Sequence, residues 1–169
     1  CAELMEHHGW KWWKKQTPDV EQIKLELVDI WHFGLSLLLQ KNTDSENLAK
    51  EISNNMVFKD KPKDFLSSVE IFASDTLKNK TFSVPLFTKM LMGMDMDLEH
   101  LYKSYIGKNV LNFFRQDHGY KDGSYIKEWG GKEDNEHLVE ISEQLDADSP
   151  SFKEKLYQTL KQRYQQLNF

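Results

Sequence analysis

Two acidic residues on one predicted helix are the first candidates for chemistry. Glu26 and Asp29 lie where apolar residues recur every three or four positions from Ile23 to Leu39 without an internal proline, the pattern of an amphipathic helix. Residues three apart share a helix face. Carboxylates on an apolar face are costly unless a cation neutralises them, and Mg2+ binds such oxygens together with water and substrate phosphates. The pair suggests metal-dependent phosphate chemistry; the alternative is that either acid lies in water at the helix edge or pairs with a lysine.

A third carboxylate can join this pair if the start of the chain packs against the same helix. Glu3 lies on a predicted helix over 1–8, which would run antiparallel to the helix of Glu26 because the connection is short. Three or four carboxylates projecting inward from two helices form a site for a hard metal ion. Glu6 is one turn from Glu3, so a Glu3-x-x-Glu6 pair and a pair with a residue preceding Cys1 both stay open.

Two carboxylate-histidine pairs allow a different metal. Asp29-x-x-His32 and Asp134-x-x-His137 each place the two side chains one helical turn apart, as in di-iron helical bundles. Those bundles use Glu-x-x-His on two packed helices, whereas the second pair here lies at the edge of a predicted loop. His32 is more simply a histidine on the flank of its helix with its hydrogen bonds satisfied.

A second group of polar residues could bind an anion. Asn112 and Arg115 are one turn apart on a predicted helix, and an arginine can grip a phosphate through two parallel hydrogen bonds. The stretch 119–131 is rich in glycine, aromatic residues and lysine, which is typical of an ordered functional loop. Since the chain has a net charge of -5, bases gathered at one place predict a local anion site, although each alone would be an ordinary surface charge.

Composition limits the class of protein. The 169 residues, 39% hydrophobic and 29% charged, predict one soluble globular domain with a substantial core. No apolar run approaches the roughly 18 to 20 residues of a membrane span, and the negative charge argues against a nucleic-acid partner. The single cysteine, Cys1, excludes an internal disulfide, as expected in the cytoplasm. Because 1–8 begins like the middle of a helix, we expect residues before Cys1.

Every predicted element is helical, which indicates an all-α bundle. Thr17-Pro18 is expected to start the long helix, which then runs to about Gln40. The three tryptophans that precede it, Trp10, Trp12 and Trp13, are each expected to pack into the core, although one could line a pocket. Further helices are predicted over 44–52, 61–77, 84–93, 98–119, 135–145 and 149–167.

Two longer motifs carry a resemblance to a known family. The first is Glu26-Leu-Val-Asp29-Ile-Trp-His-Phe33, and the second runs from Asn112-Phe-Phe-Arg115 through Gly119-Tyr120 and Tyr125-Ile-Lys127 to Gly131-Lys-Glu-Asp-Asn135. Together they resemble the dimeric, all-α dUTPases of the all-α NTP pyrophosphatase superfamily. The region from about Asn42 to Phe82 carries neither motif. The resemblance implies one all-α domain over 1–169, with about 42–82 as a smaller mobile helical insert, in a homodimer.

The resemblance also implies an activity and its metal ligands. The family hydrolyses dUTP, and also dUDP, to dUMP with Mg2+, releasing pyrophosphate or phosphate and removing dUTP from the nucleotide pool. Glu3 is similar to the second glutamate of the family's ExxE motif, whose first glutamate would precede Cys1. Glu26 and Asp29 match the ExxD metal ligands. The expected catalytic and metal-binding residues are therefore Glu3, Glu26 and Asp29.

Substrate contacts follow from the same resemblance. Trp13 is similar to the tryptophan at the uracil pocket, and Phe33 would pack near the deoxyribose. The positions that match residues holding the sugar and phosphates are Asn112, Arg115, Tyr120, Lys127, Lys132 and Asn135.

The expected mechanism is a metal-assisted hydrolysis. Glu3 would orient the attacking water or take its proton, while Arg115 and the lysines would stabilise charge on the phosphates. Two alternatives stay open: a related pyrophosphatase acting on another nucleotide such as dCTP, and a non-catalytic helical interaction module. We expect neither a nucleic acid nor a membrane as partner.

Overall fold

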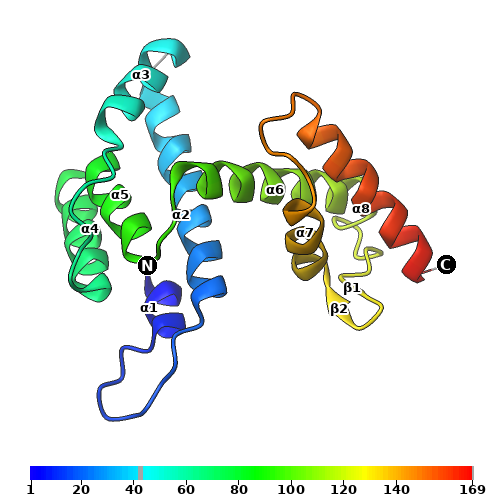
Figure 1. Ribbon diagram of the computed structural model, residues 1–169, viewed down its shortest axis with the longest axis horizontal. Helices are drawn as coiled ribbons and strands as arrows, with labels where there is room; N and C mark the ends of the chain where they lie inside the picture. The colour runs from blue at the N-terminus through cyan, green and yellow to red at the C-terminus, as the bar shows by residue number, and fades with distance from the viewer. Residues whose placement is uncertain (42–43, 169) are drawn as a thin grey trace. The chain divides into compact units, whose positions relative to one another are not determined.

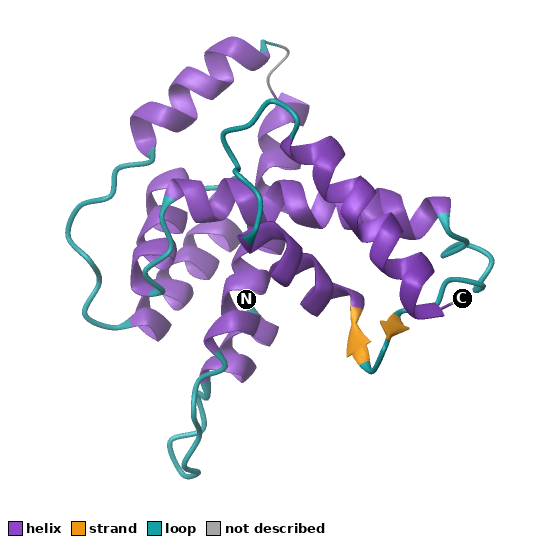
Figure 2. Ribbon diagram, turned by 45° about the vertical axis from the view of Figure 1, so that its right-hand side comes forward, coloured by secondary structure: helices purple, strands orange, loops and turns teal. Residues whose placement is uncertain are grey.

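The computed structural model describes residues 1–41 and 44–168, and the regular secondary structure of this part is almost entirely helical (Figures 1 and 2). The predicted all-α class is confirmed. The helices are α1 Ala2–His8, α2 Val20–Lys41, α3 Ser45–Asn55, α4 Phe65–Asn79, α5 Val84–Gly93, α6 Leu98–Asp117, α7 Asp134–Glu143 and α8 Phe152–Asn168.

One short hairpin corrects the expectation that every element is a helix. β1 (Glu128–Trp129) pairs antiparallel with β2 (Lys132–Glu133). Gly130 and Gly131, with φ of 55° and 82°, connect the strands, a conformation that favours glycine over other residues. Strands of two residues are too short to show the alternation of apolar and polar residues by which a strand is recognised in a sequence.

The chain divides into two compact units, Cys1–Leu98 and Glu99–Phe169, called the first and second unit below. In the first unit α1 packs on α2 and α4, α3 packs on α2 and α5, and α4 packs on α5. Its buried core draws on all five helices and the segment before α5 through Leu4, Leu27, Leu48, Phe72, Phe82 and Phe87.

The predicted insert over about 42–82 contributes to this core. Its residues 42 and 43 lie outside the described residues, and the rest forms α3, α4 and the segments beside them. Phe72 of α4 contacts Phe82 (ring centroids 5.5 Å apart), and Phe82 contacts Phe87 of α5 (5.3 Å). The range therefore packs within the first unit, while its predicted mobility stays a prediction.

The turn between α1 and α2 brings these two helices together, and Figure 1 shows the chain reversing its direction there. Gly9 ends α1 as predicted, with φ of 87° and its N–H donating to Met5 O. The predicted start of α2 at Thr17 is wrong, because Asp19 Oδ1 accepts from the N–H of Gln22 (3.2 Å). The Asp19 N–H also donates to the carbonyl of His7 (2.9 Å), so contact with α1 selects this cap.

Other helix ends shift for similar local reasons. The α4 helix begins later than predicted, because the Asp64 carboxylate accepts hydrogen bonds from the N–H groups of Leu66 and Ser67 (3.3 and 3.0 Å). Asp44 caps α3, which begins at Ser45. The α8 helix also begins later, at Phe152. Among the described residues, no helix combines the length and hydropathy of a membrane span.

The second unit is built around a buried aromatic cluster. Phe114, Trp129, Leu138, Leu156 and Tyr164 belong to its core. Trp129 is fully buried and its indole N–H donates to the carbonyl of Ile126 (2.8 Å). The predicted ordered loop over 119–131 is thus anchored near its end by a residue of the hairpin, Trp129.

Candidate active site

The acidic residues on α2 have the predicted arrangement. Glu26 and Asp29 lie one turn apart on this helix and both are partly buried, while Glu3 on the neighbouring α1 is exposed. Two carboxylates at this spacing fit Mg2+ by donor type, since that ion takes few protein ligands and keeps water and phosphate oxygens. In residues 1–41 and 44–168 no group of three or more His, Cys, Asp or Glu residues could hold a metal ion, so the metal assignment stays a prediction.

Glu6 has a different role from Glu3. Its Oε1 accepts from the indole N–H of Trp10 (2.8 Å), and its Oε2 forms an ion pair with Lys11 Nζ (2.9 Å). The hydrogen bonds from Trp10 and Lys11 lower the pKa of Glu6. Because both oxygens are engaged at the start of the α1–α2 loop, the structure disfavours the Glu3-x-x-Glu6 ligand pair that the sequence left open.

The three tryptophans of this loop are exposed, and their predicted core packing is wrong. Trp12, Trp13 and Trp10 are 89%, 60% and 41% exposed. The rings instead pack edge to face on one another, with centroids of Trp13 5.5 Å from Trp10 and 5.7 Å from Trp12. Phe33 on α2 is also exposed. The aromatic surfaces expected at the uracil and the deoxyribose are therefore accessible, and their substrate roles stay predictions.

In the second unit, Arg115 is held by a buried carboxylate that the sequence did not identify as its partner. Arg115 Nε and Nη2 on α6 donate to Oδ2 and Oδ1 of Asp134, both at 2.7 Å. The Tyr125 hydroxyl donates to the same Oδ2 (2.9 Å). Asp134 is 0% exposed and is the first residue of α7, where the helix dipole favours a negative charge.

The charges of this network follow from its partners. Burial alone would lower the pKa of Arg115, but the hydrogen bonds and the charge of Asp134 raise it above its ordinary value, so the guanidinium stays a cation. Burial and the charge of Asp134 raise the pKa of Tyr125, which keeps its hydroxyl as a hydrogen-bond donor.

The same contacts argue against the di-iron alternative. Both oxygens of Asp134 accept hydrogen bonds from the chain. His137 is buried and its Nε2 lies 2.9 Å from the carbonyl of Trp129, while its Nδ1 lies 3.3 Å from Nη1 of Arg163. Since an arginine only donates, Nδ1 accepts and Nε2 carries the proton. Asp134 and His137 therefore join α7 to its neighbours and are not arranged as a ligand pair.

The two candidate lysines are also paired with carboxylates, at the surface. Lys127 Nζ lies 3.1 Å from Glu133, and Lys132 forms an ion pair with Glu140. Glu140 also accepts from Arg163 Nη1 (2.7 Å). Exposed pairs contribute little to stability, so an incoming phosphate could replace these carboxylates at low cost.

Arg163 is a residue that sequence reasoning missed. Its helix, α8, is rich in Lys and Gln, and most of these residues are exposed, yet Arg163 is partly buried against α7. No signal in the sequence separates it from its exposed neighbours.

The remaining candidates lie near Arg115 in the chain or in space. Asn112 is exposed on α6, one turn before Arg115. The centroid of the Tyr120 ring lies 6.0 Å from the guanidinium carbon of Arg115. Asn135 follows Asp134 in the first turn of α7 and is partly buried. The second unit thus gathers Arg115 and Tyr120 beside Asp134, with Asn135 next to it in the chain.

Comparison with known proteins identifies the family. The family model described as dUTPase matches residues 1–120, which is more than half of the chain. The match includes Glu3, Trp13, Glu26, Asp29, Phe33, Asn112, Arg115 and Tyr120. It spans the region 42–82 and ends before Lys127. A search of curated proteins finds no match. The chain, whose described secondary structure is mainly helical, belongs to the all-α dUTPase family.

Proposed function

We propose that this protein hydrolyses dUTP to dUMP and pyrophosphate, and dUDP to dUMP and phosphate, in a Mg2+-dependent reaction that removes dUTP from the nucleotide pool. The observation that carries the proposal is the family match over 1–120, which includes both Glu26 and Asp29 on α2 and Arg115 on α6. It acts as a homodimer in the cytoplasm, as the resemblance to the dimeric dUTPases and the single cysteine suggest.

The acidic residues have two tasks in this proposal. Glu26 and Asp29 would hold Mg2+, which when bound supplies Lewis-acid activation of the phosphates; Glu3 is proposed as a further ligand on the resemblance alone, since the described residues present no ready-made group of three. Glu3 orients the attacking water or accepts its proton. Its exposure on α1, which packs on α2, is compatible with contact to water.

The basic residues act on the phosphates. Arg115, held by Asp134, donates from the part of its guanidinium that lies outside that pair. Lys127 and Lys132 exchange their exposed carboxylate partners for phosphate oxygens. Such fixed donors stabilise negative charge as it develops during phosphoryl transfer.

Neutral side chains complete the substrate contacts. Trp13 offers an exposed indole face for stacking with uracil, and Phe33 offers an exposed ring to the deoxyribose. The residues proposed to hold the sugar and the phosphates through hydrogen bonds are Asn112, Tyr120 and Asn135.

The test is pyrophosphate release from dUTP by the full-length protein, with Mg2+ and with a chelator. We expect turnover only with Mg2+, and a loss of turnover in Asp29→Asn. The matched control is Glu70→Gln, an exposed acid on α4 of the same unit, which should behave as the wild type. Full activity of Asp29→Asn would defeat the metal assignment.

Substrate comparisons separate the alternatives. Faster turnover of dCTP or dTTP than of dUTP would identify a related pyrophosphatase acting on another nucleotide. For a non-catalytic interaction module, we expect no Mg2+-dependent thermal stabilisation by a non-hydrolysable dUTP analogue. For the proposed enzyme, we expect a clear rise in Tm.

A further inference from the structure

A single buried residue connects three segments of the second unit. The Asp134 carboxylate binds Arg115 of α6 and Tyr125 of the loop, and its own residue begins α7. The Asp134 N–H donates to the carbonyl of Lys127 (2.9 Å). The side chain is 0% exposed. Because both carboxylate oxygens accept hydrogen bonds, this side chain has a defined orientation.

The pairing also determines which part of Arg115 can meet a ligand. A guanidinium carries five N–H groups in a planar fork. Asp134 uses the edge formed by Nε and Nη2, which leaves the N–H groups of Nη1 outside the pair. The Arg115 side chain is 18% exposed and lies beside the ring of Tyr120. Arg115 is thus partly accessible although its plane is fixed.

The pair differs from the lysine pairs in whether a ligand could break it. The side chains of Lys127 and Glu133 are 53% and 55% exposed, so water can replace either partner. Separating Arg115 from Asp134 would leave an uncompensated charge in the interior, which is strongly unfavourable. Arg115 therefore keeps its orientation when an anion binds.

We infer that Asp134 is a positioning residue that holds Arg115 so that its Nη1 edge faces a phosphate group of the nucleotide. This role rests on the proposed function, because that function supplies the phosphate chain. Asp134 itself contacts no substrate and acts only through Arg115. Replacing Asp134 leaves the positive charge of Arg115 in place but removes the fixed direction of the Arg115 N–H donors.

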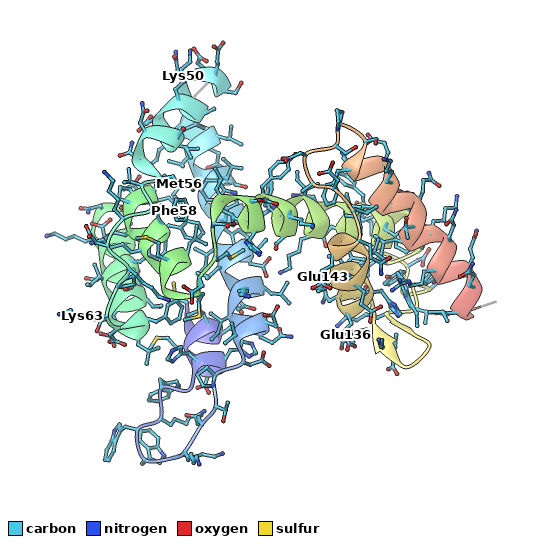
Figure 3. The ribbon with its side chains drawn as sticks, in the orientation of Figure 1. Lys50, Met56, Phe58, Lys63, Glu136 and Glu143 are labelled. Atoms are coloured by element: carbon cyan, nitrogen blue, oxygen red, sulfur yellow. The ribbon has the colours of Figure 1, made fainter. Side chains whose placement is uncertain are left out.

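The first experiment compares Asp134→Asn with Glu143→Gln in the full-length protein. Glu143 is an exposed acid at the other end of α7 (Figure 3), so both changes remove one negative charge from the same helix. We expect Asp134→Asn to lower kcat/KM for dUTP about 100-fold, the loss typical of a misplaced catalytic or binding group. Glu143→Gln should match the wild type.

A second measurement separates positioning from a general structural effect. The Arg115 Nε–H signal in NMR spectra of 15N-arginine protein can be assigned by its absence in Arg115→Lys. We expect a slowly exchanging signal in the wild type and in Glu143→Gln, and its loss in Asp134→Asn. Tyr125→Phe keeps the ion pair and removes one hydrogen bond, so it should accelerate exchange of this signal while the protein stays folded.

Binding of inorganic tripolyphosphate tests the positioning role separately from the proposed function, because this binding requires neither uracil nor hydrolysis. We expect binding by the wild type, about tenfold weaker binding by Asp134→Asn and about threefold weaker binding by Tyr125→Phe. Tripolyphosphate binding with these losses, but without dUTP hydrolysis, would refute the proposed function and support the positioning role.

The positioning role is overturned if Asp134→Asn binds tripolyphosphate as the wild type does, or if the wild type hydrolyses dUTP but does not bind tripolyphosphate. If Asp134→Asn does not fold, Tyr125→Phe decides. Unchanged Nε–H exchange and unchanged binding in Tyr125→Phe would then overturn the role.

Discussion

The two units carry candidate groups of opposite charge and hold them in different ways. In the first unit the acids Glu26 and Asp29 lie on one helix, and Glu3 is exposed on its neighbour. In the second unit each candidate cation is paired with a carboxylate: Arg115 with Asp134, Lys127 with Glu133 and Lys132 with Glu140. An anion site can be organised by counter-charges within the chain, whereas the proposed metal site takes its Mg2+ from solution.

The largest expected effect comes from the first unit. Glu26→Gln removes a carboxylate proposed to bind Mg2+ directly, so we expect at least a 100-fold loss of dUTP turnover, since even indirect partners of a metal ligand are worth 10 to 100-fold. Pyrophosphate release at saturating Mg2+ measures it, with Glu70→Gln as control. Wild-type activity in Glu26→Gln would mean that Glu26 does not bind the catalytic Mg2+, and the proposed contrast between the two units would fail.

The second effect concerns the buried pair. Arg115→Ala leaves the Asp134 carboxylate buried without its cation, so we expect the free energy of unfolding to fall by about 3 to 5 kcal/mol. Lys127→Ala, which breaks an exposed pair, should cost less than about 1 kcal/mol. Urea unfolding followed by circular dichroism measures both. Equal losses would show that the buried and exposed pairs do not differ as the structure indicates.

The third effect tests whether a carboxylate of the chain competes with a bound phosphate for the same cations. Glu140 holds both Lys132 and Arg163, so Glu140→Gln should release two cations and strengthen tripolyphosphate binding about threefold, a gain of the size expected for one exposed charge. Isothermal titration calorimetry measures it, and Glu143→Gln provides a control with the same change of net charge. Weaker binding in Glu140→Gln would show that this carboxylate positions the cations and does not compete for them.

The smallest effect lies away from the candidate site, where the Tyr157 hydroxyl of α8 donates to Asp117 of α6 (2.6 Å). Burial, this hydrogen bond and the charge of Asp117 raise the pKa of Tyr157 from 10.0 to about 12. Because the folded-state pKa is raised, the stabilisation is complete below pH 10 and is lost as the pH rises towards 12.

An alkaline absorbance titration of wild type minus Tyr157→Phe measures this shift, with a midpoint expected near pH 12. A midpoint near pH 10 would mean that α6 and α8 are not joined by this bond in solution.

Helix periodicity predicted much of the first unit. The run from Ile23 to Leu39 placed Glu26 and Asp29 on one helical face, because side-chain spacing along a helix is a local property. The start of the same helix could not be predicted as well. Thr17 and Asp19 are both acceptable caps, and the hydrogen bond from the Asp19 N–H to His7 on another helix decided between them.

The candidate site was predicted less completely in the second unit. Arg115 was singled out for its chemistry, but its partner Asp134 is 19 residues away and was considered only beside His137. The hairpin of β1 and β2, which lies between them in the chain, has strands too short to show a recognisable sequence pattern. The exposure of Trp12 was also not predicted, because large apolar residues are usually buried. Residue types alone do not show whether other side chains cover the loop that carries Trp12.

The sequence by itself determined the all-α class, the helix that carries the ExxD motif and the residues whose types suit phosphate chemistry, since these follow from local periodicity and side-chain type. Only the tertiary structure decided which charges are paired and which pairs are buried. Residues distant in the chain create that burial when they meet, and burial makes one ion pair a fixed support and leaves another open to exchange.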